Sequence, residues 1–117
     1  MMQFSESLKK NRDFQSVYRK GTSKADPFFV MYVLRNRLNR NRIGISASKK
    51  VGNSVVRHHL TRRVREAYRT QEGFFEAGYD MVFVVRTGAR DCSQKDVEKS
   101  VLRLAKRQGV LKARTEA

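Results

Sequence analysis

The sequence predicts a single-domain α+β sandwich in the order αβββαβα, with a small sheet packed against helices. Two segments, 53–69 and 93–109, place apolar residues at three- and four-residue steps, as amphipathic helices do. Two shorter segments, 28–34 and 79–86, are nearly continuous apolar runs of strand length. A chain of 117 residues suits one domain with a modest core and is short for two.

The first expected element is a short helix between Asn11, a candidate N-cap, and Gly21, which ends it. Phe14 and Tyr18 lie one turn apart on its apolar face. Periodicity favours packing of both rings on the sheet. Beside Arg19, however, the same two rings could equally stack on nucleic-acid bases.

Residues 22–27 are expected to form a loop or a short edge strand, because Pro27 has no N–H to donate to a ladder. The run 28–34 is expected as a strand with two apolar faces, one of which carries Tyr32. Such a strand is either covered on both sides or offers one side to a ligand. For Tyr32, a core tyrosine with a satisfied hydroxyl is the other possibility.

Residues 35–42 hold four arginines, a composition that predicts an exposed, mobile loop with unspecific contact to an RNA backbone. Residues 43–48 then alternate Ile or Ala with Gly or Ser, which predicts a strand. Its small-residue face would let a backbone or ligand approach, or would accommodate a bulky neighbour such as Phe14. The pattern does not separate these alternatives.

The segment 48–69 has seven cations and one acid, so a polyanion is its expected neighbour. Asn53 is placed to cap a helix, and two lysines precede that helix at the end where its dipole favours an anion such as phosphate. The helix is expected to bury one stripe and to present a cationic stripe beside it. The buried stripe is Val56, Leu60, Val64, Ala67 and Tyr68, and the second stripe is His58, Arg62, Arg65 and Arg69.

Residues 71–78 connect this helix to the strand 79–86, which completes a βαβ unit. Ser93 and Asp96 form a capping box that opens the last helix, and Gly109 ends it. The ends of the chain, residues 1–7 and 110–117, lack a core pattern and are expected to be flexible.

Composition narrows the function. A net charge of +15, with 16 arginines among 26 cations, makes nucleic acid the first partner to consider. The single Cys92 cannot form an internal disulfide, no Cys or His cluster has zinc-site spacing, and no apolar run could cross a bilayer. The sequence therefore predicts a cytoplasmic protein without a membrane partner or a metal site of its own.

Catalytic residues are not predicted. His58 and His59 are neighbours, so on a helix they diverge by about 100° and would not converge on one phosphate. There is no phosphate-binding Gly-Lys-Ser/Thr loop and no tight carboxylate cluster for Mg²⁺. The pattern favours a binder over a catalyst.

The segment 48–69 resembles the signature of the bacterial ribonuclease P protein subunit, in which a Lys-Lys-x-Gly-Asn start precedes Arg-Asn-Arg and further basic residues. The chain departs from that signature at His58 and His59, which replace the Asn and the second Arg, and at Thr61, where Lys or Arg is usual. The matching residues are Lys49, Lys50, Gly52, Asn53, Arg57, Arg62 and Arg65.

The resemblance covers nearly the whole chain and implies a ribosomal-protein-like fold with a left-handed βαβ crossover. It further implies a subunit of the ribonuclease P holoenzyme, with an RNA subunit that removes the 5′ leader of precursor tRNA by Mg²⁺-dependent hydrolysis. No obligate protein partner is expected. The implied RNA-subunit contacts are Lys49, Lys50, Asn53, Arg57, His58, Arg62, Arg65 and Arg69, and the implied leader contacts are Phe14, Tyr18, Arg19 and Tyr32.

Two other classes of function stay open. A ribosomal or other structural RNA-binding protein would satisfy the same composition. A free-standing nuclease or a major-groove DNA reader could also use a basic helix, although no preceding short helix and tight turn supports helix-turn-helix docking.

Overall fold

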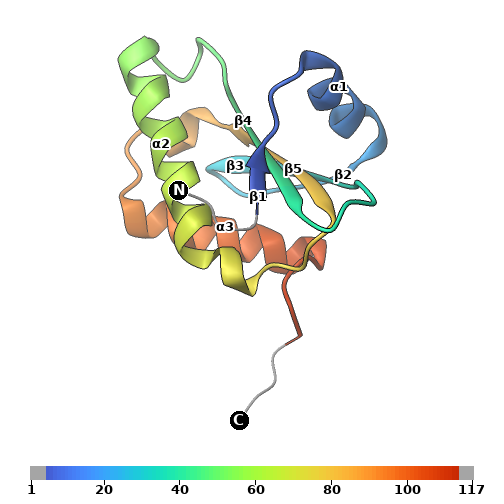
Figure 1. Cartoon of the computed structure of the whole chain (residues 1–117). Helices are drawn as coiled ribbons and strands as arrows, with labels where there is room; N and C mark the ends of the chain where they lie inside the picture. Colours follow the sequence, from blue (N-terminus) through green and yellow to red (C-terminus); the bar gives the residue numbers. More distant parts are fainter. Residues whose placement is uncertain (1–4, 114–117) are drawn as a thin grey trace.

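The computed structural model describes residues 5–113, which form one five-stranded sheet in the order β1-β4-β5-β3-β2. Helix α1 lies on one face, and α2 and α3 cover the other (Figure 1). The predicted α+β order αβββαβα is confirmed, with one further strand at its start. The elements are β1 (Ser5–Ser7), α1 (Asn11–Lys20), β2 (Thr22–Ala25), β3 (Phe29–Arg35), β4 (Asn41–Ala47), α2 (Ser54–Gln71), η1 (Glu72–Phe74), β5 (Tyr79–Val85), η2 (Thr87–Ala89) and α3 (Gln94–Gln108).

Strand β5 is the centre of the sheet, parallel to β4 and antiparallel to β3. Because β4 and β5 are adjacent and parallel, α2 is the crossover of a βαβ unit, as predicted. Strand β2 is the short edge strand that was one of the two possibilities for residues 22–27.

Strand β1 is an element that the sequence did not predict. Its residues Ser5–Ser7 pair in parallel with the start of β4. At the other end, Val110 is buried, and the Lys112 N–H donates to the Phe74 carbonyl at 2.8 Å. The prediction of flexible ends is therefore wrong for these residues, while residues 1–4 and 114–117 lie outside the described part.

The helix ends mostly follow the predicted caps. The Asn53 side chain accepts a hydrogen bond from the Val56 N–H at 3.0 Å, and the capping box between Ser93 and Asp96 is formed. Gly109 has the left-handed conformation (φ 73°) that ends α3. Asn11, however, is the first helical residue of α1 and not its cap.

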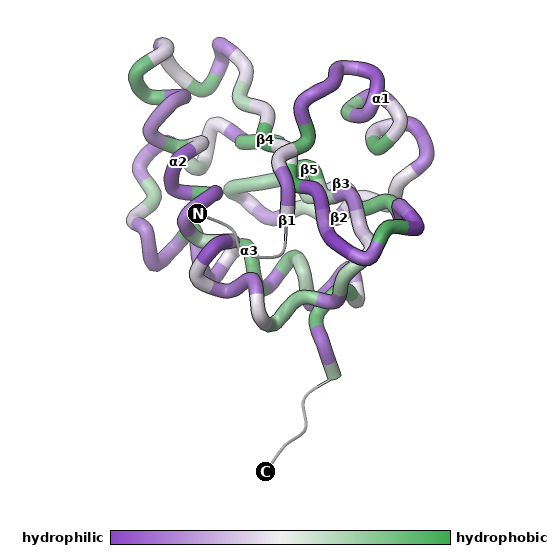
Figure 2. The backbone as a smooth tube through the Cα atoms, viewed as in Figure 1, coloured by the Kyte–Doolittle hydropathy of each residue, from purple (hydrophilic) through white to green (hydrophobic). Residues whose placement is uncertain are grey.

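Two cores of unequal size lie on the two faces of the sheet. The larger lies beneath α2 and α3 and includes Phe29 and Phe83, both fully buried. The smaller lies beneath α1 and is centred on Leu8, Val17 and Val82. Strand side chains alternate between the two faces as predicted. Figure 2 shows the hydrophobic colour concentrated on the central strands and the hydrophilic colour along much of α1 and α2.

Asp26, in the turn between β2 and β3, joins that turn to α3. Its carboxylate accepts hydrogen bonds from the Phe28 and Phe29 N–H groups at 2.9 Å each, from the Ser100 hydroxyl, and from the Arg103 guanidinium at 2.8 Å. Burial alone would raise the pKa of Asp26, but these hydrogen bonds together outweigh burial and hold the pKa below its ordinary value.

Candidate RNA interface

Helix α2 buries one side against the sheet and α3, as its periodicity predicts. Leu60, Val64, Ala67 and Tyr68 are all at most 1% exposed. Their burial fixes the rotation of the helix, so the cationic stripe of α2, defined as His58, Arg62, Arg65 and Arg69, faces away from the large core.

The cationic stripe of α2 divides into a free half and an engaged half. His58 and Arg62 are exposed and have no hydrogen-bond or ion-pair partner among residues 5–113. Arg65 is half-buried and donates to the Ser7 hydroxyl at 2.9 Å. Arg69 makes two hydrogen bonds to the Glu66 carboxylate, at 2.9 and 2.6 Å, which lower the pKa of Glu66. The charge available to an outside anion is thus greatest near the start of α2.

Two arginines of α2 lie off this stripe. Arg57 is half-buried on the side of the apolar stripe, and its Nε is enclosed without a hydrogen-bond partner in the described part of the chain. Arg63 donates to the Cys92 carbonyl, and its own carbonyl accepts from the Gln94 amide at 2.9 Å. Arg63 therefore fastens α2 to the start of α3. Arg57 is less accessible than the exposed stripe residues His58, Arg62 and Arg69.

The turn before α2 presents Lys49 and Lys50, both exposed, and the first turn of the helix holds no acid. Val51, which follows the two lysines and precedes the cap residue Asn53, is buried and fixes the turn to the core. Gly52 has no room for a side chain, because a Cβ there would lie 2.8 Å from a methyl group of Val56. The two lysines and the helix N-terminus are therefore held together at one point, where a phosphate is favoured.

The aromatic cluster consists of Phe14 and Tyr18 on α1 and Tyr32 on β3. The Phe14 and Tyr18 ring centroids lie 6.4 Å apart, and the Tyr18 and Tyr32 rings meet edge to face at 5.0 Å. All three rings pack against the small core but remain half-buried. Packing on the sheet and contact with an outside ligand, the two possibilities that the sequence left open, are thus compatible. Arg19 is exposed on the same helix.

The strand register places the aromatic cluster and the start of α2 near one strip of the sheet. Val30, Val84 and Ser46 are neighbours across three strands on the α1 face, and all are half-buried. The neighbouring row on this face contains Tyr32 and Val82. The row of Val30, Val84 and Ser46 is the one closer to the C-terminal end of β4, where the chain enters the Lys49–Lys50 turn. In Figure 1, α1 and the first turn of α2 stand on either side of these strands.

Gly44 explains how Phe14 approaches the sheet so closely. A Cβ at Gly44 would lie 2.6 Å from two ring atoms of Phe14. The small-residue face predicted for β4 therefore makes room for a bulky neighbour, which was one of the two interpretations of that pattern.

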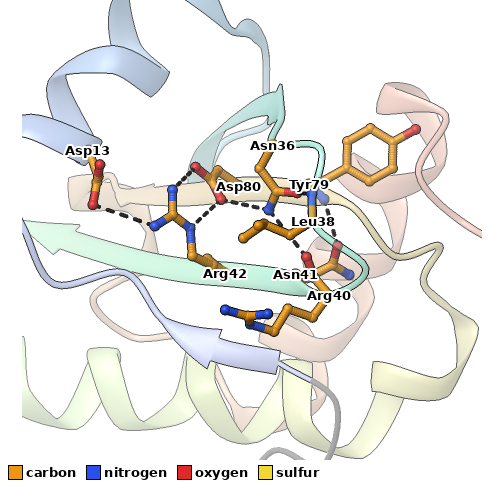
Figure 3. Close-up of polar contacts among 8 residues, drawn as sticks. All are labelled: Asp13, Asn36, Leu38, Arg40, Asn41, Arg42, Tyr79 and Asp80. Atoms are coloured by element: carbon orange, nitrogen blue, oxygen red, sulfur yellow. Dashed lines mark hydrogen bonds and ion pairs between the residues drawn. The ribbon is translucent and has the colours of Figure 1, made fainter.

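Sequence reasoning missed a polar cluster at the other end of the α1 face. Arg42 was predicted in a mobile loop, but it belongs to β4 and donates to both carboxylate oxygens of Asp80, at 2.8 and 2.6 Å (Figure 3). Asp13 of α1 lies 3.6 Å from the same guanidinium. These bonds raise the pKa of Arg42. The sequence held one sign of this ion pair, because Asp80 stands inside the apolar run 79–86 and a buried carboxylate requires a partner.

The positions of the His, Cys, Asp and Glu side chains bear on any chemistry of the chain itself. No three His, Cys, Asp or Glu side chains among residues 5–113 gather into a group that could hold a metal ion. His58 and His59 are both exposed on α2. A hollow of about 330 Å³ lies beside the end of α2, lined by residues such as Ser5, Tyr68 and Glu76, and includes none of the predicted site residues.

Comparison with known proteins agrees with this geometry. The model of the family described as Ribonuclease P matches residues 2–109. The ribonuclease P protein component of Lachnoclostridium phytofermentans is 46% identical over 102 residues, 87% of this chain and 88% of the relative. That of Alkaliphilus metalliredigens is 42% identical over 106 residues, 91% of this chain and 96% of the relative.

Solved structures give the same result. The RNase P protein of Staphylococcus aureus superposes with a TM-score of 0.84 at 34% identity, covering 91% of this chain and 97% of that chain. The RNase P protein of Thermotoga maritima gives a TM-score of 0.80 at 30% identity, covering 86% and 96%.

These matches place the basic α+β domain in the class of RNA-binding proteins. The chain belongs to the bacterial ribonuclease P protein family, whose members are the protein component of an endoribonuclease that processes tRNA. The described helices are all too short or too polar to pass through a bilayer.

Proposed function

We propose that this chain binds the catalytic RNA of ribonuclease P and the 5′ leader of precursor tRNA in the bacterial cytoplasm, and that the RNA removes the leader. The RNA subunit would contact the Lys49–Lys50 turn and the free half of the cationic stripe. The leader would contact the aromatic cluster. The observation that carries this proposal is the common position of the half-buried rings and the unpaired cations beside one strip of sheet.

The chain would contribute mainly by positioning. Holding the leader and the RNA subunit on one rigid domain reduces the entropy lost when substrate and catalyst meet. The cations would also replace counterions that screen the two RNAs from each other. Mg²⁺ held by the RNA would supply the hydrolytic chemistry. Because the cations of the protein take over part of the screening, the Mg²⁺ concentration that cleavage requires should fall when the protein is present.

A structural RNA-binding protein without a role in cleavage is the alternative. The deciding experiment is cleavage of a leader-bearing precursor tRNA by a bacterial ribonuclease P RNA at low Mg²⁺, with and without the chain, and by the chain alone. A rate gain that requires both components supports the proposal. No gain with a competent RNA supports the alternative, and cleavage by the chain alone would assign catalysis to the protein.

Single substitutions test the two surfaces separately. Phe14→Ala should weaken binding of leader-bearing precursor by about 1–3 kcal/mol, the amount expected if a base stacks on the ring, and should spare leaderless tRNA. Phe74→Ala is the matched control, because Phe74 is 60% exposed on η1, away from the cluster. Equal losses on both substrates would assign Phe14 to packing alone.

For the helix surface, Arg62→Ala should flatten the dependence of RNA affinity on salt by about 0.7–0.9 log units per log of salt. Arg90→Ala is the control, since Arg90 is also exposed and unpaired in the described part of the chain but follows η2. The same salt slope in Arg62→Ala and the unchanged protein would remove Arg62 from the interface.

A further inference from the structure

The turn between β3 and β4, residues 36–40, is built rigidly, contrary to the mobile loop that its composition predicts. The Asn36 side chain accepts from the Leu38 N–H at 2.8 Å and donates to the Arg40 carbonyl at 3.2 Å (Figure 3). It also donates to Asp80 at 2.9 Å, and the Asn36 N–H donates to the Gly78 carbonyl at 2.9 Å. Because Asp80 is buried and held by Arg42, the turn is fixed to the sheet.

Arg37, at the tip of this turn, has a left-handed backbone conformation with φ 62°, the only such non-glycine residue in the described part of the chain. A side chain with a Cβ is disfavoured there, whereas Gly would adopt this conformation freely. The backbone alone therefore gives no reason for an arginine at this position. Strained residues of this kind cluster at active sites, ligand clamps and switch regions.

Two arginines, Arg35 at the end of β3 and Arg37 in the turn, keep their charge available. Arg37 is exposed, with no partner among the residues that the structure describes. The Arg35 guanidinium lies 5.3 Å from the centre of the Tyr79 ring, and its Nη2 is 3.4 Å from the Tyr79 hydroxyl, so the ring orients it without neutralising it. Arg40, in contrast, is paired with Glu6 at 2.7 Å.

The turn lies at the opposite end of β4 from the Lys49–Lys50 turn. Strand β4 has seven residues, so at about 3.3 Å per residue the two basic turns are separated by roughly 23 Å. A phosphate at the start of α2 cannot reach Arg37. A partner that contacts both turns must be a large polyanion whose phosphates lie at least roughly 23 Å apart, as those of an RNA do.

We propose that Arg35 and Arg37 form a second phosphate-binding surface, and that the RNA subunit occupies it at the same time as it occupies the start of α2. This rests on the proposed function, because it takes the RNA subunit as the large polyanion. The fork of each guanidinium suits phosphate oxygens, and the rigid turn reduces the ordering that binding would otherwise require.

The first experiment measures affinity for a bacterial ribonuclease P RNA over a range of salt concentrations. The double variant Arg35→Ala/Arg37→Ala should bind at least about tenfold more weakly, with a salt slope smaller by about 1.4–1.8 for two lost phosphate contacts. Lys95→Ala/Lys99→Ala removes the same charge from the exposed side of α3 and should change both quantities much less. Equal losses of RNA affinity in the two double variants would show that only the net charge of the protein matters, and would overturn the proposal.

Arg37→Gly separates binding from folding. Gly relieves the left-handed strain, so the thermal midpoint of the free protein should rise while affinity for the RNA falls. Asn36→Ala keeps every arginine but releases the turn, and it should weaken binding less than the double variant does. Arg37→Gly with unchanged RNA affinity would contradict the proposal, whatever its effect on stability.

Two further arms identify the partner. Precursor tRNA alone should bind the unchanged protein and the double variant equally. A loss confined to precursor tRNA would overturn the assignment to the RNA subunit. Arg62→Ala, measured in parallel, reports on the cationic stripe of α2. Unchanged RNA affinity in Arg62→Ala would contradict the proposed function, whereas unchanged RNA affinity in the double variant alone would contradict only the second surface.

Discussion

The two faces of the sheet differ in how completely they are covered. On one face, α2 and α3 bury a core in which Phe29, Met31 and Phe83 are fully inaccessible. On the other, the buried apolar cluster beneath α1 consists, among residues 5–113, of Leu8, Val17 and Val82, and its aromatic neighbours remain half-buried. The covered face supplies most of the stability, while the incompletely covered face keeps aromatic surface available to a ligand.

Removal of one ring from each face is the strongest test of this difference. Phe29→Ala should lower the free energy of unfolding by about 3–5 kcal/mol, because it leaves a cavity in the large core. Phe14→Ala should cost only about 1 kcal/mol, since its ring is half-buried and the site can collapse. Chemical denaturation of both variants checks the prediction, and similar losses would show that the two faces contribute equally.

The carboxylates that fasten helices to each face offer a second test. Asp26→Ala should cost about 2–3 kcal/mol, because it removes hydrogen bonds to a charged carboxylate and leaves buried donors such as the Phe29 N–H unsatisfied. Asp13→Ala removes only a 3.6 Å contact with Arg42 and should cost about 0.5 kcal/mol or less. A larger loss for Asp13 in the same denaturation experiment would reverse the ranking of the faces.

The same contrast should appear as a dependence on pH. The pKa of Asp26 is lowered from its ordinary value of 3.8, so its contribution is fully present above that value and is lost as pH falls through the folded pKa. The stability difference between the unchanged protein and Asp26→Asn should therefore shrink below about pH 3.8. A difference that stays constant to lower pH would mean that the carboxylate charge is unimportant.

Gly44→Ala should change the free energy of unfolding by no more than about 1 kcal/mol. The added Cβ would displace the Phe14 ring, which can move, and the loss is partly offset by the lower chain entropy of Ala in the unfolded state. Leader-dependent binding should nevertheless fall as in Phe14→Ala. If it does not, the position of this ring is irrelevant to the leader.

Much of the fold follows from patterns that are local in the sequence. The cap at Asn53, the capping box at Ser93 and the alternation of β3 each depend on neighbouring residues. The rotation of α2 and its exposed cations followed from periodicity. The positions of the implied contact residues are therefore known, while their contact with RNA stays a prediction.

The errors have one physical origin. Strand β1 has no apolar pattern from which it could be predicted. Its serines are held instead by partners far along the chain, Ser5 by the Tyr68 hydroxyl and Ser7 by the Arg65 guanidinium. Arg42 appeared to be a loop residue until Asp80 was placed beside it. Single-sequence periodicity cannot detect a strand or an ion pair defined by such distant residues.

The central position of β5 has a consequence for synthesis of the chain. Strands β3 and β4 are consecutive and antiparallel, yet β5, the last strand to be made, lies between them. Until residue 85 has left the ribosome, β3 can pair with β2 and β4 with β1, but the edges of β3 and β4 that β5 will occupy are open. Those two edges can meet in a hairpin that the finished sheet excludes. Completion of the domain therefore waits for its final third, and truncated chains should accumulate with exposed strand edges.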